Sequence, residues 1–259
     1  MVLPPGYALN PERDYPVLWV TDGAYYLHFI PGLVNMMNGY GLLPELIIVT
    51  VGQPTGSTVA EWGSQRTADL FPGQPGALLD TTDKKDPAVQ LAESRGIDYG
   101  AITESGHADK FLNFMIDEAR PLLAKKYRMA DDHGLMGHSA GGAFTAWAMF
   151  ARPGDFKRYF IGSGTGAVAL AMERKYAETH DDLNARVFIG AGDIEADGLF
   201  GASQRLLSNP VRLGENLVLR QYPSLELDIG LYTNKGHVSV IPLSFSHGLM
   251  FLYKDLLDQ

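Results

Sequence analysis

The sequence predicts an α/β fold with a mostly parallel central sheet and helices on both of its faces. Short, nearly continuous apolar runs stand at 15–21, 43–51, 156–162, 186–192 and 227–233. Segments of helical length separate them, and buried apolar strands alternating with helices are typical of a parallel sheet. The length of 259 residues suits one such domain. We therefore expect a single domain over residues 1–259.

Composition and charge exclude several classes of protein. The net charge is −9, and no basic run is present, which argues against a nucleic-acid partner. No apolar run approaches the ~20 residues of a membrane span. The chain has no cysteine, so disulfides and thiolate chemistry are excluded, and we expect neither a metal nor a cofactor. The first residues have no basic and apolar regions of a signal peptide, so we expect a cytoplasmic location.

The N-terminal part predicts two strands with a helix between them. Pro4 and Pro5 forbid a helix at the start. The abrupt start suggests that an edge strand has been shortened or removed. The apolar strand at 15–21 ends at Asp22-Gly23, a helix-length segment covers 25–37, and the strand at 43–51 follows.

Residues 52–104 have many Gly and Pro and no sustained hydrophobic period. A connection of this length inside a compact domain is usually functional. We expect an irregular, lid-like insertion there and not a second domain.

A helical pattern returns at His107 and continues in the second half of the chain. Phe111, Met115 and Leu122 follow one stripe of a helix. Further helices are expected at 143–150, 167–180 and 199–213, the last interrupted late by Pro210, and a closing helix at 239–257.

The pentapeptide Gly137-His138-Ser139-Ala140-Gly141 has the G-x-S-x-G pattern. An apolar run precedes it and a helix-length run follows, which is the strand–turn–helix context of a nucleophile elbow. Glycine is needed at 137 and 141, because side chains there would collide with the neighbouring strand or helix. The sequence therefore predicts Ser139 as a nucleophile, while the side chain of His138 is expected to point away from that of Ser139.

A serine hydroxyl needs a base, and the base needs an acid to orient it. On a doubly wound sheet these groups follow strands in the chain order Ser, acid, His. His237 follows the last predicted strand and is the expected base. Asp193 and Glu195 both follow the strand at 186–192, and the position leaves both open as the acid. The N–H of Ala140 and that of Ala24, or alternatively Gly23, are the expected oxyanion-hole donors.

These segments resemble the putative esterase branch of the α/β-hydrolases, which holds enterochelin-type siderophore esterases, esterase D and feruloyl-type esterases. The resemblance spans nearly the whole chain. It rests on segments at 3–7, 15–18 and 22–23, an R-x-x-D-L-x-P segment at 66–72, the helix at 108–114, the elbow at 137–142 and the histidine loop at 236–242.

The resemblance implies an α/β-hydrolase fold and a serine carboxylic-ester hydrolase that cleaves a small-molecule ester or lactone through an acyl-enzyme. The family's acid stands three residues after a glycine, a spacing that Gly192 and Glu195 match and that favours Glu195 over Asp193. The family branch also suggests that Arg66 binds an anionic substrate group. Two alternatives remain open: an acyltransferase that excludes water, and a non-catalytic binding module on the same scaffold.

Overall fold

The computed structural model describes the chain except residues 54–55, 74–78, 81, 97–105 and 258–259. In the described residues, six parallel strands form one sheet in the order β2-β1-β3-β4-β5-β6. The strands are β1 (Tyr15–Val20), β2 (Ile47–Thr50), β3 (Met129–His138), β4 (Arg158–Gly162), β5 (Ala185–Gly192) and β6 (Leu225–Tyr232). The strand order reverses between β1 and β3, and a crevice for ligands lies outside the carboxyl ends of strands at such a point.

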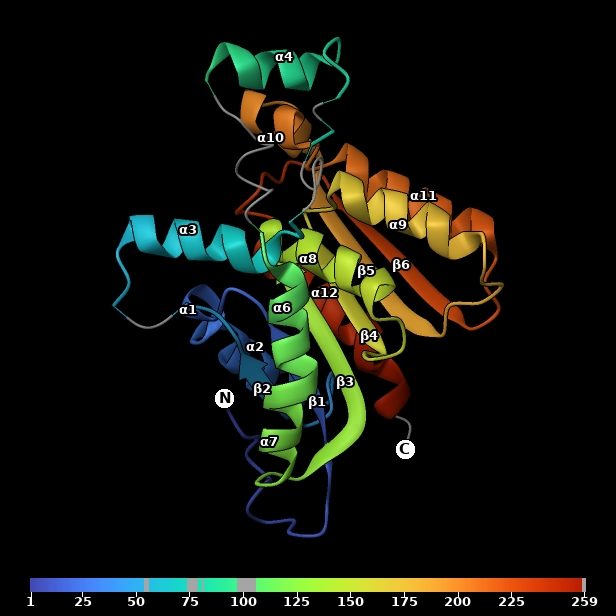
Figure 1. Ribbon diagram of the computed structural model, residues 1–259. Coiled ribbons are helices and arrows are strands. Elements are labelled where there is room, and N and C mark those ends of the chain that lie inside the picture. Colours follow the sequence, from blue (N-terminus) through green and yellow to red (C-terminus); the bar gives the residue numbers. More distant parts are fainter. Residues whose placement is uncertain (54–55, 74–78, 81, 97–105, 258–259) are drawn as a thin grey trace.

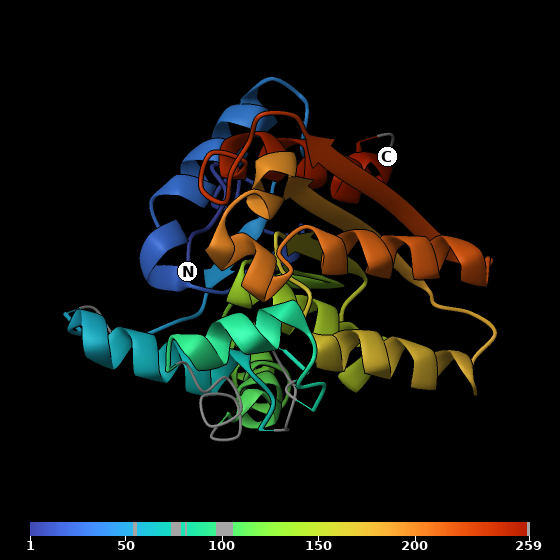
Figure 2. The ribbon, with the colours of Figure 1, turned by 90° about the horizontal axis from the view of Figure 1, so that it is seen from above.

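Helices cover both faces of the sheet, as predicted (Figure 1). One face carries α6 (Ala108–Asn113), η1 (Phe114–Ala119), α7 (Arg120–Ala124), α8 (Ala140–Ala151), α9 (Ala167–Ala177) and α11 (Ser208–Arg220). The other carries α1 (Gly23–Tyr26), α2 (Phe29–Gly39), α12 (Ile241–Tyr253) and η3 (Lys254–Leu256). Figure 2 shows α2 and α12 on one side of the strands, and α9 and α11 on the other.

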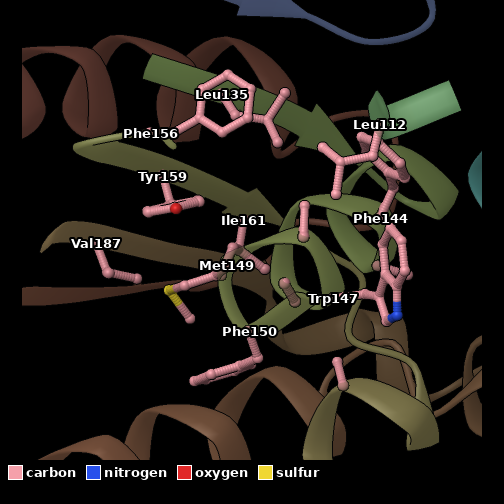
Figure 3. Close-up of a cluster of buried hydrophobic side chains, with 14 of the residues drawn as sticks. Leu112, Leu135, Phe144, Trp147, Met149, Phe150, Phe156, Tyr159, Ile161 and Val187 are labelled. Carbon is pink, nitrogen blue, oxygen red and sulfur yellow. The ribbon is translucent and has the colours of Figure 1, made fainter. Parts of the chain in front are cut away.

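Helix α8 lies at the centre of the larger core. Residues 140–150 of this helix are all buried, because the sheet, α6 and α9 enclose it. Figure 3 shows Met149 of α8 beside Ile161 of β4, and Phe144 with Trp147 on the side of Leu112 of α6. Burial of apolar area of this kind is the main stabilising term of the fold, at roughly 25 cal/mol per Å².

The insertion is more regular than the sequence indicated. Within 52–104, helices form at α3 (Val59–Leu70) and α4 (Pro87–Ser94). A capping box starts α3, because the Thr58 hydroxyl accepts from the N–H of Glu61 and the Glu61 carboxylate accepts from that of Thr58. Beyond the carboxyl end of the sheet, α4 packs on α10 (Leu199–Gln204) (Figure 1). Four parts of the segment in which we expected a lid-like insertion, or adjoining it, lie outside the described residues: 54–55, 74–78, 81 and 97–105.

Several helix bounds differ from the expectation. The segment at 199–213, expected as one helix, breaks at 205–207. Proline is tolerated only in the first turn of a helix, so a new helix, α11, begins just before Pro210. The helix after His107 contains the π-helical turn η1 ahead of Pro121, where the N–H of Arg120 bonds the Met115 carbonyl. Proline has no N–H to continue the α-helical pattern, which accounts for this turn.

The chain start reaches the sheet edge. Val2 and Ile48 form an antiparallel bridge, with N–H to carbonyl distances of 2.8 and 3.0 Å. The start of the chain thus contacts β2 through this bridge. Among the described residues, every helix is too short or too polar to span a bilayer.

Truncating Phe156 tests the larger core. Its ring is 1% exposed and packs beside Tyr159 (Figure 3). Phe156→Ala is expected to lower the free energy of unfolding by about 3–5 kcal/mol in urea denaturation, because it leaves a cavity. The control Leu219→Ala, at a side chain that is 79% exposed, is expected to change it by less than about 0.5 kcal/mol. Equal effects of the two changes would contradict this core.

Candidate active site

Ser139 occupies a tight turn between β3 and α8. Its backbone has φ 61° and ψ −122°, which a non-glycine residue adopts only under constraint. A Cβ at Gly137 would lie 2.1 Å from the Gly141 carbonyl oxygen, and one at Gly141 would lie 2.2 Å from Thr21 Oγ1. The strand and helix therefore approach this closely because both residues are glycine. This is the geometry of the expected elbow.

The two turns expected to supply oxyanion donors differ in which backbone N–H groups are free. Ala140 is the first residue of α8, so its N–H has no carbonyl one turn earlier to bond. After β1, the N–H of Gly23 donates to the Val51 carbonyl at 3.0 Å, whereas that of Ala24 has no backbone partner in the described part of the chain. Of the two expected donors in this turn, Ala24 is thus the one left available for an oxyanion.

His237 and Glu195 contact each other through loops that follow β6 and β5. His237 Nδ1 lies 2.9 Å from Glu195 Oε2. The other carboxylate oxygen, Oε1, accepts from the N–H of Gly192 at 2.8 Å and from the Ser163 hydroxyl at 2.7 Å. Burial raises the pKa of Glu195, but these hydrogen bonds outweigh it and hold the pKa below its usual value. Glu195 is therefore a buried, ionised partner of the imidazole.

Asp193 has a different set of contacts. Its Oδ1 accepts from the N–H of Ile194 at 2.8 Å and from that of Lys235 at 3.3 Å. Asp193 therefore fixes its own turn and the loop before His237, and makes no hydrogen bond to the imidazole among the described residues.

His138 lies closer to the site than expected. Its Nε2 donates to the His237 carbonyl at 2.8 Å, and the centroids of the two imidazole rings are 4.7 Å apart. Burial, and next the charge of His237, lower the pKa of His138 to about 4. The ring is thus neutral and holds the histidine loop against the elbow. Neither this contact nor that of Ser163 has a sequence signal, because each depends on which loops become neighbours in space.

Ser139 and His237 line one cavity of about 550 Å³, together with His138 and Arg66. In the described part of the chain no hydrogen bond joins Ser139 to His237. Such catalytic bonds often tighten only in the substrate complex, so a longer approach is compatible with proton transfer.

Arg66, on α3, forms a two-point ion pair with Asp22. Its Nε and Nη2 donate to Asp22 Oδ1 and Oδ2 at 2.6 and 2.9 Å. The side chain of Asp22 is 2% exposed, and its backbone has a positive φ of 55°. The pair therefore fixes the turn that carries Ala24, and it leaves Arg66 at the cavity wall.

Among the described residues, no group of three or more His, Asp or Glu side chains has the arrangement of a metal site. The convergent groups are a hydroxyl, an imidazole, a carboxylate and free N–H groups. This set suits nucleophilic acyl transfer.

Comparison with protein families agrees with the site. The model of the family described as "Putative esterase" matches residues 1–197, about three quarters of the chain. The chain belongs to this family. It is a carboxylic ester hydrolase of the α/β-hydrolase fold, as the resemblance implied.

Known relatives of this esterase are distant and match most of its length. Ferri-bacillibactin esterase BesA of Bacillus subtilis is 23% identical over 93% of this chain and 80% of its own. A siderophore enterobactin esterase of Emericella nidulans is 25% identical over 80% of this chain and 71% of its own. The structure of an IroE-like serine hydrolase from Shewanella oneidensis has a TM-score of 0.74 at 20% identity, covering 98% of this chain and 74% of its own. The match to the esterase family favours hydrolysis over the transferase and binding-module alternatives.

The buried His138 of this esterase is expected to make stability depend on pH. The unfolded chain protonates this ring near 6.5 and the folded chain near 4. Between pH 4 and 6.5 the unfolded state binds more protons than the folded state. The folded state therefore loses stability as the pH falls from 6.5 to 4. We expect a loss of roughly 3 kcal/mol, from the ~1.4 kcal/mol per pKa unit.

His138→Gln keeps an N–H donor and does not titrate. Urea denaturation of both proteins between pH 4 and 7 measures the difference in slope. Parallel pH profiles of the two proteins would contradict a neutral, buried His138.

Proposed function

We propose that this ester hydrolase acts through an acyl-enzyme on Ser139, with His237 as general base and acid and Glu195 as its orienting group. The observation that carries the proposal is the buried Glu195–His237 hydrogen bond, at the cavity that His237 shares with Ser139. The carboxylate selects the tautomer with a proton on Nδ1, which leaves Nε2 free to take the proton of the hydroxyl.

The reaction then has two balanced steps. Ser139 Oγ attacks the ester carbonyl as His237 Nε2 takes its proton. The N–H groups of Ala140 and Ala24 stabilise the oxyanion, and the C–O bond breaks as His237 returns the proton to the leaving alcohol. Water, deprotonated by His237, then attacks the acyl carbon. The bond from that carbon to Ser139 Oγ breaks as His237 gives the proton to Oγ, which releases the acid and restores Ser139. Glu195 stays ionised throughout.

The substrate in this proposal is a small-molecule ester or lactone. The two named relatives act on siderophores, so siderophore esters belong in the first assays. Arg66 remains the proposed substrate-binding cation, because its side chain lines the cavity. Two of its guanidinium nitrogens contact Asp22, and this ion pair holds the side chain in place. The cytoplasmic location stays a prediction.

Removing the nucleophile tests the proposal. Ser139→Ala is expected to lower kcat for p-nitrophenyl acetate by about 10⁵–10⁶-fold and to abolish labelling by a fluorophosphonate probe, because no hydroxyl remains to form the acyl-enzyme. Ser224→Ala, at an exposed position where β6 begins, is the control and is expected to keep both. Retained turnover by Ser139→Ala would refute the assignment.

A matched pair of amide substitutions separates the two candidate acids. Glu195→Gln is expected to reduce kcat by about 10³–10⁴-fold with little change in KM, because the imidazole loses the partner that fixes its tautomer. Asp193→Asn is expected to lose far less, since its contacts are to backbone N–H groups. The reverse ranking in steady-state kinetics would make Asp193 the acid.

A further inference from the structure

Two cavities of unequal size meet at Ser139. The larger, about 550 Å³, has a mainly apolar wall from α1, α2, α3 and the segment leading into α12: Tyr25, Tyr26, Phe29, Trp62, Val238 and Ile241. The smaller, about 170 Å³, lies between α3, α8, the loop after β4, and α10, with walls from Phe71, Ala143, Thr165, Phe200 and Leu206. Arg66 and Ser139 line both, so they stand at the boundary.

The two cavities differ in which catalytic group they contain. His237 lines the larger cavity, and Ala140 lines the smaller. A substrate can therefore reach Ser139 from either cavity. His237, which gives its proton to the leaving alcohol, lines only the larger one. This asymmetry assigns the two halves of an ester.

In the tetrahedral intermediate the reacting carbon carries Oγ of Ser139, the oxyanion, the leaving oxygen and the acyl substituent. The oxyanion points to the N–H groups, and the leaving oxygen must approach His237 to receive a proton before it departs as the alcohol. The alcohol half then extends into the larger cavity. The acyl substituent, on the remaining bond of the reacting carbon, then extends into the smaller cavity.

The sizes define the substrate class. At the ~30 Å³ that a water molecule occupies in the liquid, the smaller cavity holds about six non-hydrogen atoms. The larger has the volume typical of sites for drug-sized ligands, and its aromatic walls suit a flat ring.

We propose, on the basis of the proposed function, that this esterase prefers esters of a compact acid with a bulky aromatic alcohol. A siderophore ester with a large acid part falls outside this class.

A pair of isomeric substrates tests the orientation in the wild-type enzyme. 2-Naphthylmethyl acetate has a small acid and a large alcohol, and methyl 2-naphthylacetate has the two reversed, with an alkyl alcohol in both. The expected kcat/KM is at least about tenfold higher for 2-naphthylmethyl acetate than for methyl 2-naphthylacetate. A factor of this size is typical when one or more methylenes do not fit a pocket. Equal values, or a preference for methyl 2-naphthylacetate, would overturn the assignment.

Variants in each cavity test which half each one binds. Leu206→Ala enlarges the smaller cavity from a side chain that is 6% exposed and lies outside the main core clusters. It is expected to raise kcat/KM for p-nitrophenyl octanoate relative to the acetate by about tenfold. Trp62→Ala is expected to reduce the preference for 2-naphthylmethyl acetate over ethyl acetate without changing the acyl-length profile. The exposed control Leu219→Ala is expected to match wild type.

Fluorophosphonate titration of each protein separates the two possible failures. Absence of labelling at Ser139 would overturn the proposed function, and the cavity assignment with it. Full labelling combined with a Leu206→Ala profile that changes only with the alcohol would overturn the cavity assignment alone. The isomer comparison needs no variant, so it holds even where a variant does not fold.

Discussion

The close contact between the end of β3 and the first turn of α8 holds Ser139 in its positive-φ conformation. The missing side chain of Gly137 permits it, that of Gly141 lets the helix approach Thr21 after β1, and the enclosed packing of α8 keeps the helix from moving away. Strain of order 1–3 kcal/mol at such a residue persists only where the surroundings over-determine it. The hydroxyl of Ser139, the N–H of Ala140 and the boundary between the two cavities all take their positions from this turn.

The second requirement is an ionised carboxylate in a buried place. Glu195 meets it because β4 and β5 end side by side, which brings the Ser163 hydroxyl and the Gly192 N–H to the same carboxylate oxygen. The other oxygen is then free for His237. His138 adds a link from the elbow to the loop of His237. Neighbouring strand ends thus bring the partners of the Glu195 carboxylate together beside the imidazole of His237.

The sequence predicts the parallel sheet and the elbow well, because glycine spacing and continuous apolar strands are local signals. The choice of Glu195 over Asp193 came from a family spacing, since both residues stand in one turn. Ser163 and His138 were not predicted as part of the site, because their contacts depend on strand order. Helix α3 was missed because the hydrophobic period of that region is weak. The π-helical turn before Pro121 was missed because it arises from the missing N–H of proline, which hydrophobic periodicity does not reveal.

The proposed mechanism requires Ser139 to carry the acyl group between the two steps. Rapid-quench intact-protein mass spectrometry with p-nitrophenyl acetate, followed by peptide mapping, detects this covalent species. A transient mass increase of one acetyl group is expected on Ser139 alone, and none is expected in Ser139→Ala. Turnover without any covalent species, or an acetyl group on another residue, would contradict this mechanism.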